Sequence, residues 1–162
     1  MMKNIIYGMA ISALLLAGCK GKETVTSTAT YHSYETECLG KSMDGSQTLR
    51  VWASGRNKSD AVEQARKKAV YDVVFTGISV GSGECNAFPV LDEPNARKKY
   101  EAYFDKFFAD GGAYRKYVTT KGQPKAGTDK FQGKGNLMYS IVVTVNRSEL
   151  RQRFESDNII VK

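Results

Sequence analysis

The chain has 162 residues, of which 41% are hydrophobic and 25% are charged. This is the composition of an ordinary globular protein, and the length suffices for one domain with a hydrophobic core rather than for two. Lysine and arginine outnumber aspartate and glutamate by 24 to 17. Such a surplus favours anionic neighbours; the simpler interpretation is a solvated surface, because the basic residues are dispersed among acidic ones.

The N-terminus carries a positive charge at Lys3 and an apolar run over residues 5–16. A membrane-spanning helix needs about 20 apolar residues, so this shorter run is typical of a secretory signal. Leu16-Ala17-Gly18-Cys19 resembles the lipobox of bacterial lipoproteins. The resemblance implies that residues 1–18 are removed and that acyl chains on Cys19 hold the protein in a membrane.

The stretch after the lipobox is expected to be a tether. Residues 19–36 contain many threonines and serines without apolar periodicity, so we expect a lipidated cysteine, a flexible segment and then a single domain over residues 37–162. Lys20-Gly21-Lys22-Glu23 lacks the acidic cluster that marks some cell-surface lipoproteins. We therefore expect an outer-membrane protein that faces the periplasm, with the cell surface as the alternative.

Cys38 and Cys85 remain once Cys19 is acylated. In an exported protein an even pair of cysteines predicts a disulfide, worth roughly 4 kcal/mol through loop closure. Two free, buried thiols are the main alternative. A zinc site with His32 would lack paired short spacings, and a Cys–His nucleophile would lack a third orienting group.

Alternation and helical spacing predict the first half of the domain. A strand over residues 47–54 places Leu49, Val51 and Ala53 on one face. A helix capped by Ser59 and ended by Gly77 follows, with apolar residues at three- and four-residue steps. Residues 79–89 are expected to form a Gly/Ser loop.

A second helix begins at Pro94, after Asp92 and Glu93, which are interpreted as capping groups. One face of this helix is aromatic, which indicates core, although a partner groove is the alternative; its members are Tyr100, Tyr103, Phe104, Phe107 and Phe108.

The remaining segments are predicted to be two strands, a loop and a helix. Residues 115–120 are expected to form a strand, 121–127 a mobile basic loop and 137–145 the strongest strand. Asn146 and Glu149 form a capping box for a final helix that presents Leu150 and Phe154.

These elements predict an α+β domain in which helices pack on one face of an antiparallel sheet of three or four strands. Val51-Trp52-Ala53-Ser54-Gly55 precedes a helix with Ala61, Ala65 and Ala69, and Tyr139-Ser140-Ile141-Val142-Val143 follows later. This pattern resembles small envelope lipoproteins related to the N-terminal domain of flagellar assembly protein T. The resemblance implies a non-enzymatic accessory or assembly role in the envelope.

The sequence predicts no catalytic site, metal site or cofactor, because the single histidine lies in the tether and no carboxylate stands out. We expect binding of an envelope protein, with the membrane held through Cys19 and no nucleic-acid partner. An anionic glycan or lipopolysaccharide is the alternative, as is an uncharacterised enzyme. The candidate anion-binding residues are Lys98, Lys99, Lys121, Lys125, Lys130 and Lys134.

The predicted disulfide between Cys38 and Cys85 can be tested by mass spectrometry. The mature protein analysed without reduction should be lighter by two hydrogen atoms, and a digest should link the peptides of Cys38 and Cys85. Alkylation of both cysteines without prior reduction would show free thiols and contradict the pairing.

Overall fold

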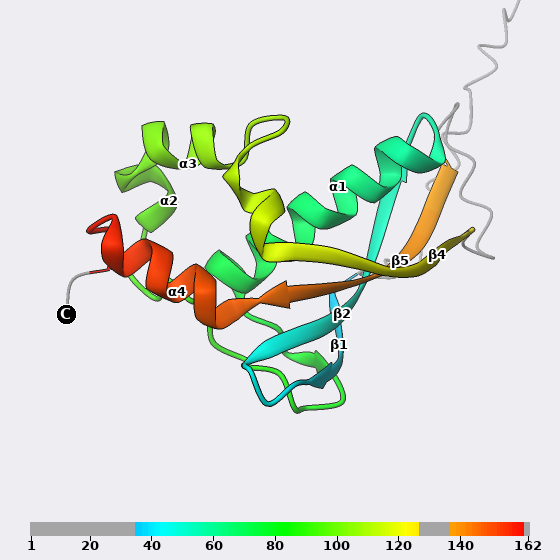
Figure 1. Cartoon of the computed structure of the whole chain (residues 1–162), viewed down its shortest axis with the longest axis horizontal. Coiled ribbons are helices and arrows are strands. Elements are labelled where there is room, and N and C mark those ends of the chain that lie inside the picture. The colour runs from blue at the N-terminus through cyan, green and yellow to red at the C-terminus, as the bar shows by residue number, and fades with distance from the viewer. Residues whose placement is uncertain (1–34, 127–136, 161–162) are drawn as a thin grey trace, which may run out of the picture. The chain divides into compact units, whose positions relative to one another are not determined.

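Figure 1 shows the computed structural model of the chain, which describes residues 35–126 and 137–160, all within the unit Ser33–Lys162. Five strands form one open sheet in the order β3-β1-β2-β5-β4. All neighbours are antiparallel except β1 and β3, which are parallel. The predicted α+β class is confirmed. The strands are β1 Glu37–Lys41, β2 Ser46–Gly55, β3 Val80–Gly81, β4 Val118–Ala126 and β5 Leu137–Asn146.

The helices pack on one face of this sheet, as predicted. The longest helix, α1, contacts β2, β4 and β5, and in Figure 1 it lies along the sheet, apart from α2, α3 and α4. The helices are α1 Lys58–Tyr71, the π-helix η1 Asp72–Thr76, α2 Ala96–Lys99, α3 Glu101–Phe107, the 3-10 helix η2 Ala113–Tyr117 and α4 Arg147–Ser156.

The core lies between α1 and the central strands. Leu49 and Val51 of β2 are fully buried, as the alternation predicts, and Ile141, Val143 and Val145 of β5 are buried beside them. The helix meets this surface with Ala61, Ala65 and Ala69, each 0% exposed. Because alanine has a short side chain, the helix approaches the sheet closely at these positions.

Helix ends partly match the predictions. Asn146 accepts a hydrogen bond from the Glu149 amide at 3.1 Å, which confirms the cap of α4. For α1 the predicted cap Ser59 is wrong, because Asn57 accepts from the Asp60 amide at 2.9 Å instead. Gly77 ends the helical segment with a positive φ of 81°, where a Cβ would clash with the Ala87 carbonyl.

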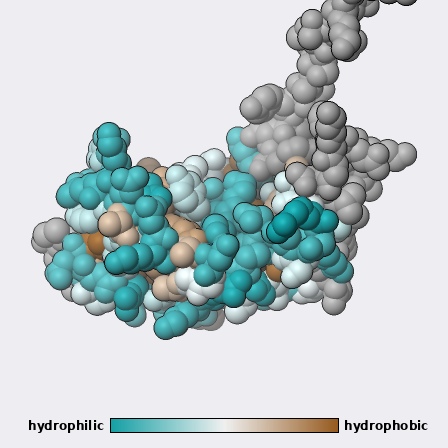
Figure 2. All heavy atoms as spheres, turned by 90° about the horizontal axis from the view of Figure 1, so that it is seen from above, coloured by the Kyte–Doolittle hydropathy of each residue, from teal (hydrophilic) through white to brown (hydrophobic). Residues whose placement is uncertain are grey.

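The predicted aromatic helix is two helices. The helical conformation is interrupted at Tyr100, whose φ of −110° and ψ of 35° are not helical. Phe104 and Phe107 are buried, and Phe104 packs edge-on against Phe75 and Phe154 with centroids 4.8 and 5.7 Å apart. Figure 2, which views this side from above, shows a mostly hydrophilic surface with hydrophobic atoms in a limited area. The aromatic stripe therefore serves chiefly as core.

Several expectations about the strands are wrong. Residues 115–117 belong to η2, and the strand begins at Val118. It continues to Ala126, where a mobile loop was expected, because Lys121, Lys125 and Ala126 pair with β5 on either side of an irregularity in the register. Strands β1 and β3 were not predicted; both are short, and β3 lies in the expected Gly/Ser loop.

Thr36, at the end of the expected tether, contacts the core. It is 6% exposed, and its hydroxyl donates to the Asp72 carboxylate. Arg147, at the start of α4, is half-buried, and it donates to the carbonyls of Val73 and Pro89 at 3.4 and 3.2 Å. Burial lowers the pKa of its guanidinium.

Two tyrosines bind carboxylates from the edge of the core. The Tyr114 hydroxyl donates to Glu63 of α1, and the Tyr103 hydroxyl donates to Asp157 after α4. Burial, and then the hydrogen bond to the carboxylate, raises the pKa of each phenol to about 12. Arg115 also donates to Glu63, at 2.7 Å, so this contact fastens η2 to α1.

The aromatic core gives a stability prediction. Phe104→Ala should lower the free energy of unfolding by about 3–5 kcal/mol, because it removes a fully buried ring and leaves a cavity. Phe88→Ala is the matched control, since this ring is 79% exposed, and it should change stability by less than about 0.5 kcal/mol. Urea unfolding measures both, and equal losses would contradict the assignment.

The tyrosine contacts predict a pH dependence. The folded pKa of about 12 lies above the ordinary value of about 10. Because the folded state favours the neutral phenols, their contribution is fully present below about pH 10 and is lost as pH rises through about 12. Ultraviolet titration should show late ionisation that Tyr103→Phe and Tyr114→Phe each reduce; ionisation of all tyrosines near pH 10 would contradict it.

Candidate functional site

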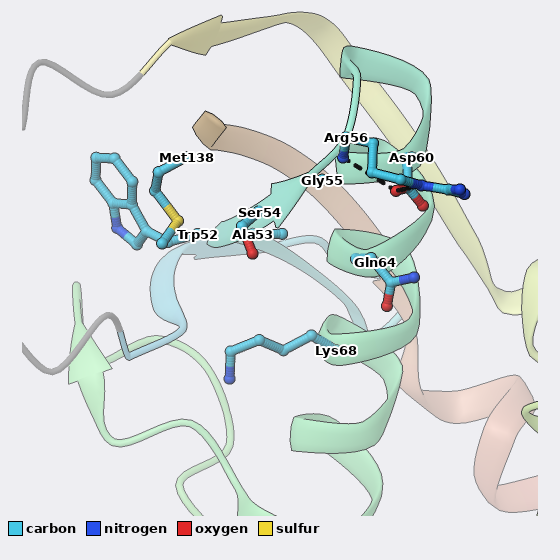
Figure 3. Close-up of a pocket in the computed structure, with 9 residues that line it drawn as sticks. All are labelled: Trp52, Ala53, Ser54, Gly55, Arg56, Asp60, Gln64, Lys68 and Met138. Carbon is cyan, nitrogen blue, oxygen red and sulfur yellow. Dashed lines mark hydrogen bonds and ion pairs between the residues drawn. The ribbon is translucent and has the colours of Figure 1, made fainter. Parts of the chain in front are cut away.

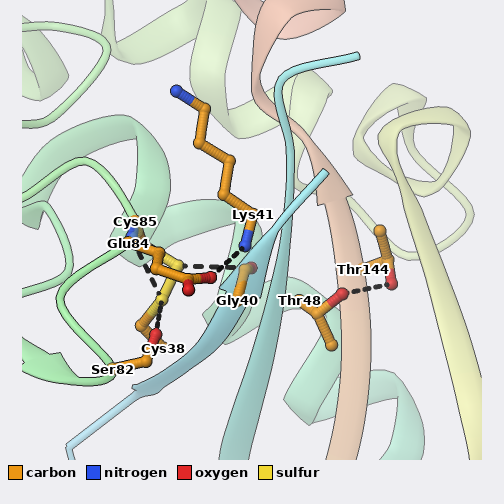
Figure 4. The surroundings of a disulfide bond; sticks show 8 residues. All are labelled: Cys38, Gly40, Lys41, Thr48, Ser82, Glu84, Cys85 and Thr144. Atoms are coloured by element: carbon orange, nitrogen blue, oxygen red, sulfur yellow. Dashed lines mark hydrogen bonds between the residues drawn. A yellow bond between two sulfur atoms is a disulfide. The ribbon is translucent and has the colours of Figure 1, made fainter. Parts of the chain in front are cut away.

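The two cysteines predicted to pair lie at bonding distance, with sulfur atoms 2.04 Å apart. The bond joins β1 to the loop after β3 (Figure 4). Hydrogen bonds surround it: the Cys85 amide donates to the Cys38 sulfur at 3.2 Å, and the Lys41 amide donates to Glu84 at 3.3 Å. Both cysteines are buried, so the bond fixes the edge of the sheet and offers no exposed thiol.

The candidate anion-binding lysines do not form one patch. Lys98 and Lys99 lie on α2 and Lys121 lies on β4, which Figure 1 shows well apart. Lys99 is paired with Glu93 at 2.7 Å, and this bond raises the pKa of its ammonium group. Lys125 is also on β4. Lys130, Lys134 and the proposed lipidation site Cys19 lie outside the described residues.

The structure instead reveals a groove between the end of β2 and α1. It encloses about 500 Å³, and we name it the α1 groove. Strand β1 pairs with β2 over Gln47–Arg50, and the groove follows beside the rest of β2. Figure 3 shows the lining residues: Trp52, Ala53, Ser54, Gly55, Arg56, Asp60, Gln64, Lys68 and Met138.

One wall of the α1 groove is a polar row on the helix. Asp60, Gln64 and Lys68 follow at four-residue steps, which places them on one helix face. In Figure 3 the side chain of Lys68 extends away from α1, and Gln64 lies one turn nearer Asp60 on the same helix. The row exists because the alanine face of the same helix is turned to the sheet, so the groove depends on that packing.

The other end of the groove is apolar. Trp52 of β2 and Met138 of β5 lie on the same face of the sheet, because Ser54 pairs with Met138 and Trp52 with Ser140, and this face is opposite to the one that packs against α1. Trp52 is half-buried. An indole and a flexible thioether are side chains that frequently anchor protein contacts.

Hydrogen bonds hold the charged residues of the groove in place. Arg56 donates its amide to Asp60 at 3.1 Å and its Nε at 3.4 Å, and these bonds lower the pKa of the Asp60 carboxyl. The Lys68 ammonium donates to Asp72 at 2.7 Å. The Asp72 carboxylate also accepts from Thr36, so one buried carboxylate joins the start of the domain to the groove wall.

A second, smaller hollow of about 160 Å³ lies beyond Lys68, which lines both hollows. Its other polar members include Thr36, Asp72, Thr76 and Ser79. These groups can exchange hydrogen bonds with polar atoms, but they do not pair a nucleophile with a base. Within residues 35–126 and 137–160, no cluster of three histidine, cysteine or acidic side chains could hold a metal ion.

The sequence did not single out the α1 groove. The polar row was visible as Asp60, Gln64, Lys68 and Asp72 at helical spacing, but such a row is normally a solvated face. The polar row becomes a groove wall because the pairing of β1 with β2 ends at Arg50 and leaves the rest of β2 uncovered on that side. No pattern in the sequence indicated where this pairing ends.

Comparisons with known proteins add no assignment. Scans of family models, curated proteins and solved structures found no match to this chain. None of the helices that the structure describes is long and apolar enough to cross a membrane.

Proposed function

We propose that this protein is a lipid-anchored envelope protein that binds another protein through the α1 groove and does no chemistry of its own. The lipobox resemblance supports the anchor at Cys19, and the lack of an acidic cluster over Lys20-Gly21-Lys22-Glu23 supports a periplasm-facing position in the outer membrane. The single observation that carries the binding role is the groove itself, which combines an apolar end with a polar wall.

The chemistry of the groove fits a protein partner. Trp52 and Met138 offer apolar area at one end, and an exposed amide at Gln64 with a half-exposed ammonium at Lys68 offers hydrogen bonds along the wall. Binding sites on proteins commonly combine a few apolar anchors with such polar neighbours.

An anionic glycan is the weaker candidate. Its binding would need several cations converging on one surface, but the described candidate lysines lie on separate elements and Lys99 is already paired. We therefore retain the protein partner as the proposed function.

The proposal predicts the behaviour of a pull-down. The full chain with wild-type sequence should capture a protein from detergent-solubilised envelopes at low and at high salt, since an apolar contact is not screened. Trp52→Ala should reduce recovery by about ten-fold or more, the usual loss at an aromatic anchor. Quantitative mass spectrometry of the eluates measures recovery.

Phe88→Ala serves as the control, because it too removes an aromatic ring, one that is exposed and lies outside the groove. It should leave recovery unchanged. Equal recovery with Trp52→Ala and wild type, or no protein partner at either salt, would refute the groove as the binding surface.

A further inference from the structure

A third hollow lies between the segment before α2 and the segment after α4, and it shares no lining residue with the α1 groove. It encloses about 300 Å³, near the lower limit for small-molecule sites. Its floor is aliphatic: Val90, Leu91 and Ile159 are 4, 6 and 7% exposed, and Ile160 is half-buried. We name this hollow the aliphatic pocket.

The floor is held firmly. The amides of Val90 and Leu91 donate to the carbonyls of Val73 and Val74 at 3.0 and 2.9 Å. The Ile159 amide donates to the Phe154 carbonyl at 2.8 Å. The pocket is therefore formed by backbone that is tied to η1 on one side and to α4 on the other, so its shape exists before any ligand arrives.

Acidic and basic side chains both line the rim of the aliphatic pocket. Glu93 and Lys99 neutralise each other through a contact of 2.7 Å. Asp92 was expected to cap the following helix, but α2 has no side-chain cap. Within the described part of the chain, the Asp92 carboxylate makes no hydrogen bond or ion pair, so an anion remains available at the rim.

Arg151 supplies the opposite charge. Its side chain is 52% exposed, and its Nε forms a long ion pair with the Glu155 carboxylate at 3.7 Å, which leaves the other N–H donors of the guanidinium for a ligand. A guanidinium has five N–H donors in a planar fork that matches a carboxylate. A cation with donors to spare and an anion thus both line the hollow above the aliphatic floor.

We propose that the aliphatic pocket binds a free α-amino acid with an aliphatic side chain. Its carboxylate is received by Arg151, its ammonium group by Asp92, and its side chain by the floor of Val90, Leu91 and Ile159. A ligand with a carboxylate alone would be repelled by the Asp92 carboxylate and would leave it without a partner. A ligand with an amine alone would be repelled by the Arg151 guanidinium and would leave it without a partner. A zwitterion can form an ion pair with each of the two residues.

Ligand-observed NMR on the full chain in detergent micelles tests the proposal with millimolar L-leucine and three relatives. Isocaproate lacks the ammonium group, isoamylamine lacks the carboxylate, and glycine lacks the side chain. Leucine should bind saturably, and each relative should bind about ten-fold or more weakly, because each loses one charge-assisted contact or the apolar contact.

Two variants assign the charged roles. Arg151→Gln should weaken leucine and isocaproate together, whereas Asp92→Asn should weaken leucine while leaving isocaproate equal or improved. Lys98→Gln is the matched control, since this exposed cation on α2 does not line the pocket. Thermal melts of all three variants should match the wild type, because the altered side chains are exposed.

Three results would overturn the inference: no saturable leucine binding, leucine and isocaproate of equal affinity, or an unchanged affinity in both Arg151→Gln and Asp92→Asn. Loss of binding in Lys98→Gln as well would indicate a general charge effect and would also contradict a defined site.

Discussion

The close contact between the alanine face of α1 and the sheet is the constraint on which the rest of the domain depends. Ala61, Ala65 and Ala69 are completely buried against β2, β4 and β5. A larger side chain at any of these positions would push the helix away from the strands, since a packed interior does not absorb extra volume. The same contact fixes the helix rotation, which places Asp60, Gln64 and Lys68 beside the end of β2. The α1 groove is therefore a consequence of core packing.

The π-helix η1, which follows α1, connects the packed helix to the segments that form the aliphatic pocket. Within η1 the carbonyls of Val73 and Val74 accept hydrogen bonds from Val90 and Leu91. Arg147 adds a bond to Val73 from the start of α4. A π-helix departs from the regular pattern of helical hydrogen bonds, and such departures are frequent at functional sites. Here it anchors the backbone that forms the floor of the aliphatic pocket.

Much of the fold could be predicted from local pattern. The alternation at Leu49 and Val51, the spacing of the alanines and the capping box at Asn146 each follow from residues close in sequence. The errors have two origins. Residues 121–126 look like a loop because of Gly122 and Pro124, yet pairing of Lys121, Lys125 and Ala126 with the distant strand β5 extends β4 through them. At the start of α1 the error is local, because Asn57 rather than Ser59 accepts the hydrogen bond from the Asp60 amide. Neither the α1 groove nor the aliphatic pocket could be predicted. Each is formed by segments far apart in the sequence, and the spacing of apolar residues does not show which distant segments lie together.

Hydrogen exchange on the full chain tests the central role of the alanine contact most directly. If α1 is packed on the sheet as a permanent part of the core, its amides around Ala65 and Ala69 should exchange only with global unfolding, in the same slowest class as those of β2 and β5. Exchange of the α1 amides at a distinctly faster rate than those of the two strands would show that the helix opens separately, and would contradict the account.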